Sequence, residues 1–416
     1  MTMKRFVYAL VLFVIFAFCA TAFLACGGDD DDEDRQPAQD DDDDITDDDD
    51  STDDDDDDND DDSSGSTWTF VVYMAADNDL YDFALEDLTE MKSVGSTSDV
   101  TILVIFDGTQ QGDSRYLYIK EGEWEEEGAP GELNMADPQT VRDGAAWAFD
   151  NHPADRYALV FWNHGDGWMK GDRKAPYKTI CQDDSAGGEY LGNDELDQAL
   201  YWIRANTAAT TIDLIGFDAC LMQMVEIAYL ARDDARVMVG SEETESGSGW
   251  AYDRFLAELV VDPGMSAATL GTHIAQTFVE TPDSTQSAVD LTRISALAGA
   301  VDGFAQELIS VGGISNGQVI SAYNSTLYFD NYDYIDLYDF AEKIADASIN
   351  SSLTASAQSV RNAVDDAVIW HGHGDSYFAD EHGLSIYFPD PYLSFYDSTY
   401  EELAFAQDTD WKDAIQ

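Results

Sequence analysis

The chain has 416 residues, and its 85 aspartates and glutamates against 20 lysines and arginines give a formal net charge of −65 at pH 7. So acidic a chain does not offer the clustered basic side chains that hold phosphates, which excludes nucleic acid as an expected partner. Basic substrates and divalent cations are the partners that this charge favours.

The N-terminus predicts an export signal over residues 1–25. Lys4 and Arg5 precede an apolar run, and small residues lead to Cys26, the order found in secretory signals. The ending FLAC-GG resembles the lipobox of bacterial lipoproteins, although Phe23 stands where leucine is usual. We therefore expect Cys26 to carry lipid and to anchor an exported chain at the cell envelope or surface. An uncleaved transmembrane anchor is the alternative.

A strongly acidic segment follows. Residues 29–62 contain 24 acidic residues and one arginine. Such a segment cannot bury apolar surface and repels itself, which predicts a disordered stalk over residues 26–66. Weak calcium scavenging is the alternative, but the segment lacks the glycine-turned loop of an EF-hand.

Short apolar runs and helix-like stretches alternate from residue 67 onward. Strands are expected at 67–76, 99–108, 156–165, 211–220, 235–243 and 382–390. Helices are expected at 80–94, 138–151, 192–206 and 220–233, and a hairpin at 115–128. Continuous apolar strands that alternate with helices predict an α/β fold with a mostly parallel sheet flanked by helices.

The pattern becomes mainly helical from about residue 260. We therefore divide the folded region into a core over 67–260 and a helical C-terminal part over 261–416. The late strand at 382–390 is expected to complete the sheet.

Two cysteines belong to the folded region, Cys181 and Cys220, and a disulfide between them is the structural alternative to a reactive thiol. Cys220 ends the run IDLIGFDAC, and His164 lies just past the buried strand in YALVFWNHGDGW. Functional groups collect where the strands of parallel sheets end. We therefore expect these two side chains to lie close together.

A thiol and an imidazole at neighbouring strand ends can perform nucleophilic catalysis without a cofactor. The helix expected directly after Cys220 would lower the pKa of its thiol, and His164 would act as general base and acid. The backbone N–H groups of Gly165 and Cys220 could bind the oxyanion. A buried structural cysteine and a capping histidine are the alternative.

The segments around these residues identify a family. FVVYMAADNDLYDFALEDL, LVFWNHGDGW, IGFDACLMQMVEIAY and VGSEETESGSGWAYDRFL, in this order, resemble the clostripain family of cysteine peptidases. SAVDLTRI, YIDLYDFA and GLSIYFP extend the resemblance to residue 390. It implies a caspase-like catalytic core with a His164–Cys220 dyad. It also implies endopeptidase cleavage of proteins and peptides after Arg or Lys, and we expect a monomer.

A pocket for a basic side chain needs a carboxylate, because a buried cation must be paired. Asp218 matches the family position for that role; capping of the following helix is the alternative. Residues 241–252 resemble the family's pocket-wall loop, in which Glu245 suits a cation and Gly247 allows backbone approach. Trp250 either walls the pocket or belongs to the core.

A cluster of basic residues lies between the two dyad residues. The resemblance implies self-cleavage in this region, and glycine and proline there suit an exposed processing site. The alternative is a solvated basic loop. The four candidate residues are Lys170, Arg173, Lys174 and Lys178.

The loop ADNDLYD holds candidate calcium ligands, Asp77 and Asp79. The resemblance implies calcium dependence, and carboxylate oxygens suit that ion. Aspartates are also common in ordinary turns and caps, which is the alternative.

The sequence also offers a weaker metal-site candidate and two alternative functions. His371 and His373 are spaced like zinc ligands but lack a second pair, and they follow VRNAVDDAVIW, which predicts a helix. A peptidase of different specificity on the same fold is one alternative function. The other is a non-catalytic, acidic cell-surface binding protein, which a disulfide between Cys181 and Cys220 would favour.

Overall fold

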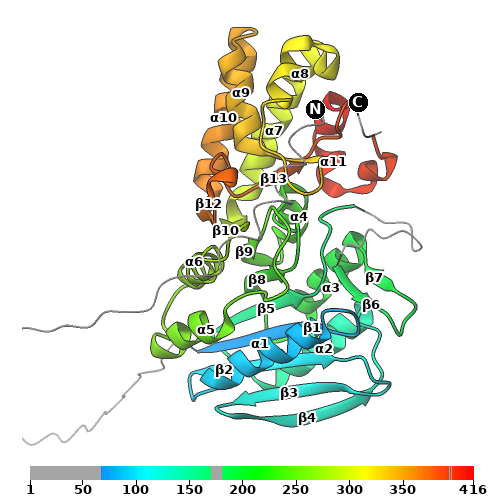
Figure 1. Ribbon diagram of the computed structural model, residues 1–416, viewed down its shortest axis with the longest axis vertical. Helices are drawn as coiled ribbons and strands as arrows, with labels where there is room; N and C mark the ends of the chain where they lie inside the picture. The colour runs from blue at the N-terminus through cyan, green and yellow to red at the C-terminus, as the bar shows by residue number, and fades with distance from the viewer. Residues whose placement is uncertain (1–66, 170–179, 393, 395) are drawn as a thin grey trace, which may run out of the picture. The chain divides into compact units, whose positions relative to one another are not determined.

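The computed structural model describes residues 67–169, 180–392, 394 and 396–416 (Figure 1). The expected signal (1–25), the stalk (26–66) and the lipidation site Cys26 lie outside these residues. So do the expected processing residues Lys170, Arg173, Lys174 and Lys178. Within the described ranges, no helix is both long enough and apolar enough to cross a membrane.

A nine-stranded sheet forms the centre of the described region, in the order β12-β10-β9-β8-β5-β1-β2-β3-β4. Its middle is parallel and made of β9, β8, β5, β1 and β2. These strands are Ala235–Gly240, Ile212–Asp218, Arg156–Trp162, Trp68–Ala75 and Val100–Asp107. The expected hairpin is confirmed as β3 (Ser114–Lys120) and β4 (Glu123–Gly131), antiparallel at one edge. The predicted α/β fold with a mostly parallel sheet is therefore confirmed.

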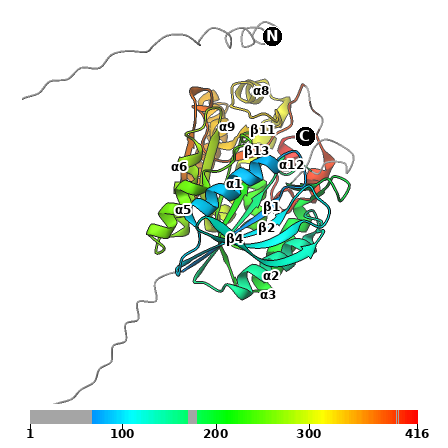
Figure 2. The same ribbon diagram turned by 60° about the horizontal axis from the view of Figure 1, so that its bottom comes forward.

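Helices cover both faces of this sheet (Figure 2). Because side chains alternate along a strand, Phe70, Val72 and Met74 of β1 pack on one side, whereas Val71 and Tyr73 pack on the other. The first side is covered by α1 (Tyr81–Val94), α5 (Tyr252–Val261) and α6 (Ala267–Phe278). The second is covered by α2 (Pro138–Asn151), α3 (Asn193–Asn206) and α4 (Val225–Ala231). Burial on both sides explains the continuous apolar runs.

The C-terminal part completes the sheet, but not through the expected strand. β10 (Thr285–Asp290) pairs antiparallel with β9, and β12 (Val368–His373) pairs antiparallel with β10. The expected late strand is shorter, β13 (Ser385–Tyr387), and pairs with β11 (Tyr334–Asp336) in a separate two-stranded sheet. Besides α6, the α-helices of this part are α7 (Ile294–Ser310), α8 (Gly317–Tyr323), α9 (Leu337–Ala347), α10 (Ser351–Ala367), α11 (Ala404–Asp408) and α12 (Trp411–Ala414).

Two helix predictions are corrected. The helix expected from residue 220 begins only at Val225, because the N–H groups of Leu221 and Gln223 donate to the carbonyls of Glu243 and Ser241 instead of starting a helical ladder. The helix expected to run to Trp370 ends at Ala367, where β12 begins.

Candidate active site

The ends of β5 and β8 bring His164 and Cys220 to one pocket. Trp162 pairs with Asp218 in the parallel register, and the N–H of Asn163 donates to the carbonyl of Asp218 at 3.3 Å. The pocket has a volume of about 110 Å³. It is lined by Leu80, Trp162, Asn163, His164, Asp218, Ala219, Cys220, Glu245, Ser246, Gly247 and Gly249.

His164 is held from the loop after β1. Its Nε2 lies 2.8 Å from Oδ1 of Asp79, whose side chain is 81% exposed. A carboxylate only accepts hydrogen bonds, so this contact places the proton on Nε2 and leaves Nδ1 with a lone pair in the neutral ring. Asp79, expected as a calcium ligand, is thus engaged with the histidine.

Cys220 lies in the turn between β8 and α4, where Leu221 adopts a positive φ of 64°. Its sulfur accepts a hydrogen bond from the N–H of Glu245 at 3.2 Å. Burial raises the pKa of the Cys220 thiol, an effect that the Glu245 N–H offsets only in part. The expectation of a pKa lowered by an adjoining helix is wrong, because α4 begins five residues later. Cys220 and Cys181 are both free, so the expected alternative of a disulfide is wrong too.

Gly165 packs directly against the backbone of the cysteine. A Cβ atom on Gly165 would lie 2.4 Å from the carbonyl oxygen of Cys220 and 3.0 Å from Cβ of Ala219. Only glycine permits so close an approach between the two strand ends. The assignment of the Gly165 and Cys220 N–H groups to an oxyanion site stays a prediction.

Asp218 forms the buried base of the pocket, with 5% of its surface exposed. Its Oδ2 accepts hydrogen bonds from the hydroxyl of Tyr252 at 2.9 Å and from the N–H of Trp250 at 3.3 Å. The following helix is preceded by Met224 without a side-chain cap, so the alternative of Asp218 as its cap is wrong. Gly249 has a φ of +54°, and a Cβ there would lie 3.0 Å from Oδ1 of Asp218. Glycine at this position keeps space open beside the carboxylate.

Two further acids interact with Asp218: Glu245, which also lines the pocket, and the buried Asp87. Burial raises the pKa of Asp218 to about 6, and a hydrogen bond with Glu245 opposes this rise. Burial, together with the charge of Asp218, raises the pKa of Glu245 and raises that of Asp87 to about 9. Asp218, with the lower pKa, therefore loses its proton before Asp87 does as the pH rises.

The pocket-wall loop is only partly as expected. Gly247 lines the pocket, and a Cβ there would lie 2.7 Å from the ring of Phe83. Trp250 is fully buried, and its ring fills the space above Gly216 in β8, where a Cβ would lie 2.7 Å from Cη2. Trp250 was expected either to wall the pocket or to belong to the core, and the structure shows that it belongs to the core.

Residues 72–416 match the family model described as the clostripain family, peptidase family C11. The chain belongs to this family. It is therefore a cysteine peptidase, and the alternative of a non-catalytic surface protein is wrong. Clostripain of Hathewaya histolytica is 26% identical over 411 residues, covering 80% of this chain and 77% of the relative.

Solved structures of family C11 share the fold. A secreted C11 cysteine protease from Bacteroides thetaiotaomicron, in complex with an irreversible peptide inhibitor, is 23% identical with a TM-score of 0.65. An inactive zymogen C11 protease from Parabacteroides distasonis is 18% identical with a TM-score of 0.64. Both comparisons cover 83% of this chain and 99% of the solved chain. At these identities the likeness establishes the fold of the clostripain family.

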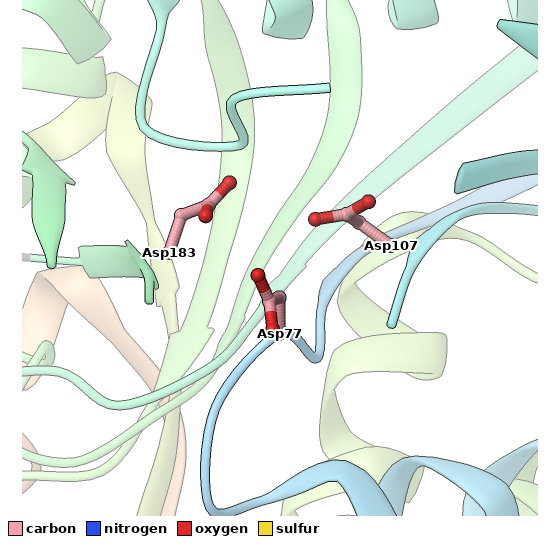
Figure 3. Close-up of side chains that lie close together, drawn as sticks. All are labelled: Asp77, Asp107 and Asp183. Atoms are coloured by element: carbon pink, nitrogen blue, oxygen red, sulfur yellow. The ribbon is translucent and has the colours of Figure 1, made fainter. Parts of the chain in front are cut away.

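Three carboxylates from separate segments converge outside the pocket lining (Figure 3). Asp77 follows β1, Asp107 ends β2, and Asp183 ends β6 (Ile180–Asp183), which pairs with β7 (Glu189–Leu191). Burial, opposed in part by the Ser114 hydroxyl, raises the pKa of Asp107 to about 8. Of the three, only Asp77 was predicted from the sequence as a ligand. Asp107 stood at the end of a predicted strand, which was a usable signal, whereas Asp183 had none.

The two histidines with zinc-like spacing are both bonded to one carboxylate. His371 and His373 lie on β12 and contact the same atom, Oε1 of Glu381, through Nδ1 at 3.0 and 3.1 Å.

Proposed function

We propose that this clostripain-family peptidase cleaves peptide bonds after Arg or Lys, with Cys220 as nucleophile and His164 as the proton-transfer group. The observation that carries the proposal is the single pocket that both residues line, with the buried carboxylate of Asp218 at its base. A guanidinium or ammonium group that enters this pocket finds an unneutralised negative charge.

The proposed reaction starts from the thiol form of Cys220, because burial raises its pKa. Nδ1 of His164, free when Nε2 is held by Asp79, takes the thiol proton as the sulfur attacks the scissile carbonyl carbon. The oxyanion that forms is stabilised by the N–H groups of Gly165 and Cys220. His164 then gives its proton to the leaving amine as the C–N bond breaks. Water hydrolyses the resulting thioester by the same proton transfers and restores the thiol.

The dyad and the pocket are tested together by hydrolysis assays. The full chain and its Cys220→Ala variant are given peptides with Arg, Lys, Asn or Asp before the scissile bond. Cleavage after Arg and Lys by the parent alone is expected. Cleavage only after Asn or Asp would support the dyad but contradict the role of Asp218. That outcome would favour the alternative of a peptidase with a different specificity.

Self-processing between His164 and Cys220 is part of the proposal. We infer cleavage after Lys170, Arg173, Lys174 or Lys178, which the chain's own specificity would recognise. Intact-mass analysis should find two fragments for the parent and one uncut chain for Cys220→Ala. A parent that is active as a single uncut chain would contradict this step.

We also propose an exported peptidase anchored through lipid on Cys26. The support is the lipobox-like FLAC-GG sequence, and the similar protease from Bacteroides thetaiotaomicron is described as secreted. Radiolabelled fatty acid should be incorporated by the parent and not by Cys26→Ser, and only the parent should sediment with membranes. Equal labelling of the two proteins would contradict the anchor.

A further inference from the structure

The three converging aspartates, Asp77, Asp107 and Asp183, are almost completely excluded from solvent, with 6%, 0% and 0% of their surfaces exposed. Each offers one carboxylate oxygen, and these oxygens all lie within 4.8 Å of one another. Two oxygens bound to one calcium ion can be at most about 5 Å apart, because Ca–O distances are about 2.3–2.6 Å. The spacing therefore suits a shared ion.

One carboxylate oxygen of Asp107 independently indicates that a cation binds at this site. Its Oδ1 accepts a hydrogen bond from the hydroxyl of Ser114, but its Oδ2 is buried and has no hydrogen-bond partner. Figure 3 shows an Asp107 oxygen directed toward the space between Asp77 and Asp183. A buried carboxylate oxygen without a donor is costly unless a cation or a proton neutralises the group.

The other two carboxylates are held in place by backbone donors. The N–H of Ser185 donates to Oδ2 of Asp77 at 2.9 Å. The N–H groups of Met135 and Ala186 donate to the two oxygens of Asp183 at 2.9 and 2.8 Å. These bonds orient the carboxylates and leave each with further lone pairs.

We propose that Asp77, Asp107 and Asp183 bind a hard divalent cation of the calcium or magnesium class. The donor set contains only oxygen, which favours these ions over softer metals. The ion would join three segments that are distant in sequence: the loop after β1, the end of β2 and the β6–β7 hairpin.

This site is connected to the histidine of the dyad. The side-chain amides of Asn78 and Asn163 both donate to the carbonyl of Gln182 at 3.1 Å, next to Asp183. Asn163 precedes His164, and Asp79, two residues after Asp77, contacts its ring. The cation would thus position His164 through both neighbours. This consequence rests on the proposed function, whereas the cation site does not.

Thermal unfolding tests the site in the full chain carrying Cys220→Ala, which prevents self-cleavage. Calcium and magnesium are each compared with chelator. A ligand that prefers the folded state raises Tm, whereas acidic sites that the unfolded chain keeps give no rise. We expect at least one of the two ions to raise Tm by about 3 °C or more, and the larger rise identifies the preferred ion.

Two variants test whether the rise in Tm comes from this cation site. Asp107→Asn should lose the rise, and its Tm in chelator should equal or exceed that of the parent, because one crowded carboxylate is gone. Asp184→Asn, an exposed neighbour in the same hairpin, should keep the full rise. Should Asp107→Asn fail to fold, calorimetric titration of Asp77→Asn with calcium and with magnesium should show the loss of one binding site.

Several results would overturn the site. They are no rise with either ion, an undiminished rise in Asp107→Asn, or an unchanged titration of Asp77→Asn. The cation could also raise Tm while the kcat of the active parent stays the same with cation and with chelator. That result would support the cation site but contradict its link to His164.

Discussion

The backbone N–H of Glu245 donates a hydrogen bond to the sulfur of Cys220, across an N···S distance of 3.2 Å. The loop that contributes Glu245, Ser246, Gly247 and Gly249 to the pocket therefore also contacts the proposed nucleophile. The side chain of the same Glu245 is hydrogen-bonded to Asp218 at the base of the pocket. In the proposed function, recognition of the basic side chain and placement of the thiol would thus depend on one loop, which would align a bound substrate with the nucleophile.

The first prediction concerns the charge of Asp218. Asp218→Asn removes the negative charge and keeps the size of the side chain. The kcat/KM for Arg and Lys peptides should fall about 100-fold or more, because the buried cation would lose its paired charge. Asp87→Asn is the matched control: Asp87 is buried beside Asp218, but its pKa of about 9 keeps it neutral at pH 7. Equal losses in the two variants would argue against a specific role for the Asp218 charge.

The second prediction is the pH dependence of specificity. Burial raises the pKa of Asp218 from 3.8 to about 6, so the carboxyl is charged above about pH 6 and becomes neutral below it. The ratio of kcat/KM for an Arg peptide to that for its citrulline counterpart should fall as the pH is lowered from 7 to 5. The ratio cancels ionisation of the dyad, which acts on both peptides. A ratio that stays constant across this range would contradict the prediction.

The third prediction links pH to stability through Glu226. This buried residue accepts hydrogen bonds from the N–H of Tyr387 and the hydroxyl of Tyr400, while its Oε2 has no partner. Burial raises its pKa from 4.5 to about 7. Between these values the folded chain holds a proton that the unfolded chain has lost. The contribution of Glu226 to the free energy of unfolding is therefore complete below pH 4.5 and falls by about 1.4 kcal/mol per unit as the pH rises to about 7.

Urea unfolding of the Cys220→Ala chain at several pH values measures this effect. Glu226→Gln cannot ionise, so its stability should change less steeply with pH over the same range. Parallel curves for the two chains would show that Glu226 does not titrate as described.

The fourth prediction concerns the close approach of Gly165 to Cys220. Gly165→Ala places a Cβ 2.4 Å from the Cys220 carbonyl oxygen, so the backbone at the cysteine must shift. We expect kcat to fall about 100-fold, since displacement of the reacting atoms by about 1 Å has effects of this order. Gly299→Ala, in α7 with open space around the added methyl group, should keep full activity and gain about 0.5–1 kcal/mol of stability. Unchanged kcat in Gly165→Ala would show that this contact does not position the nucleophile.

Much of this architecture could be predicted from the sequence because the strands that carry the site are continuous apolar runs. His164, Asp218 and Cys220 stood at the ends of such runs, and the structure places all three at one pocket. The Asp79–His164 and Glu245–Cys220 contacts could not be predicted in the same way, because they join loops whose relative position depends on the folded sheet.

The errors have physical causes as well. β10 was missed because its buried side chains are largely polar: Ser287, for example, bonds the side-chain amide of Gln223 and the carbonyl of Gly383 at 2.7 and 2.6 Å. The run after Cys220 resembles a helix in composition, yet its N–H groups bond residues beyond the end of β9. Trp250 lay in a loop that resembles a pocket wall. Because Gly216 has no side chain, the ring of Trp250 packs against it in the core.

The central claim is that Cys220 is the nucleophile of a pocket selective for basic side chains. Its most direct test is labelling with a peptide ketone that alkylates active-site thiols and carries Lys or Arg before the ketone, followed by mass spectrometry of the intact and digested chain. We predict one adduct per chain, on Cys220, with Cys181 unmodified and no adduct in Cys220→Ala. The same reagent with Asp at that position should react far more slowly. An adduct on Cys181, or equal labelling by the Asp and Arg reagents, would contradict the account.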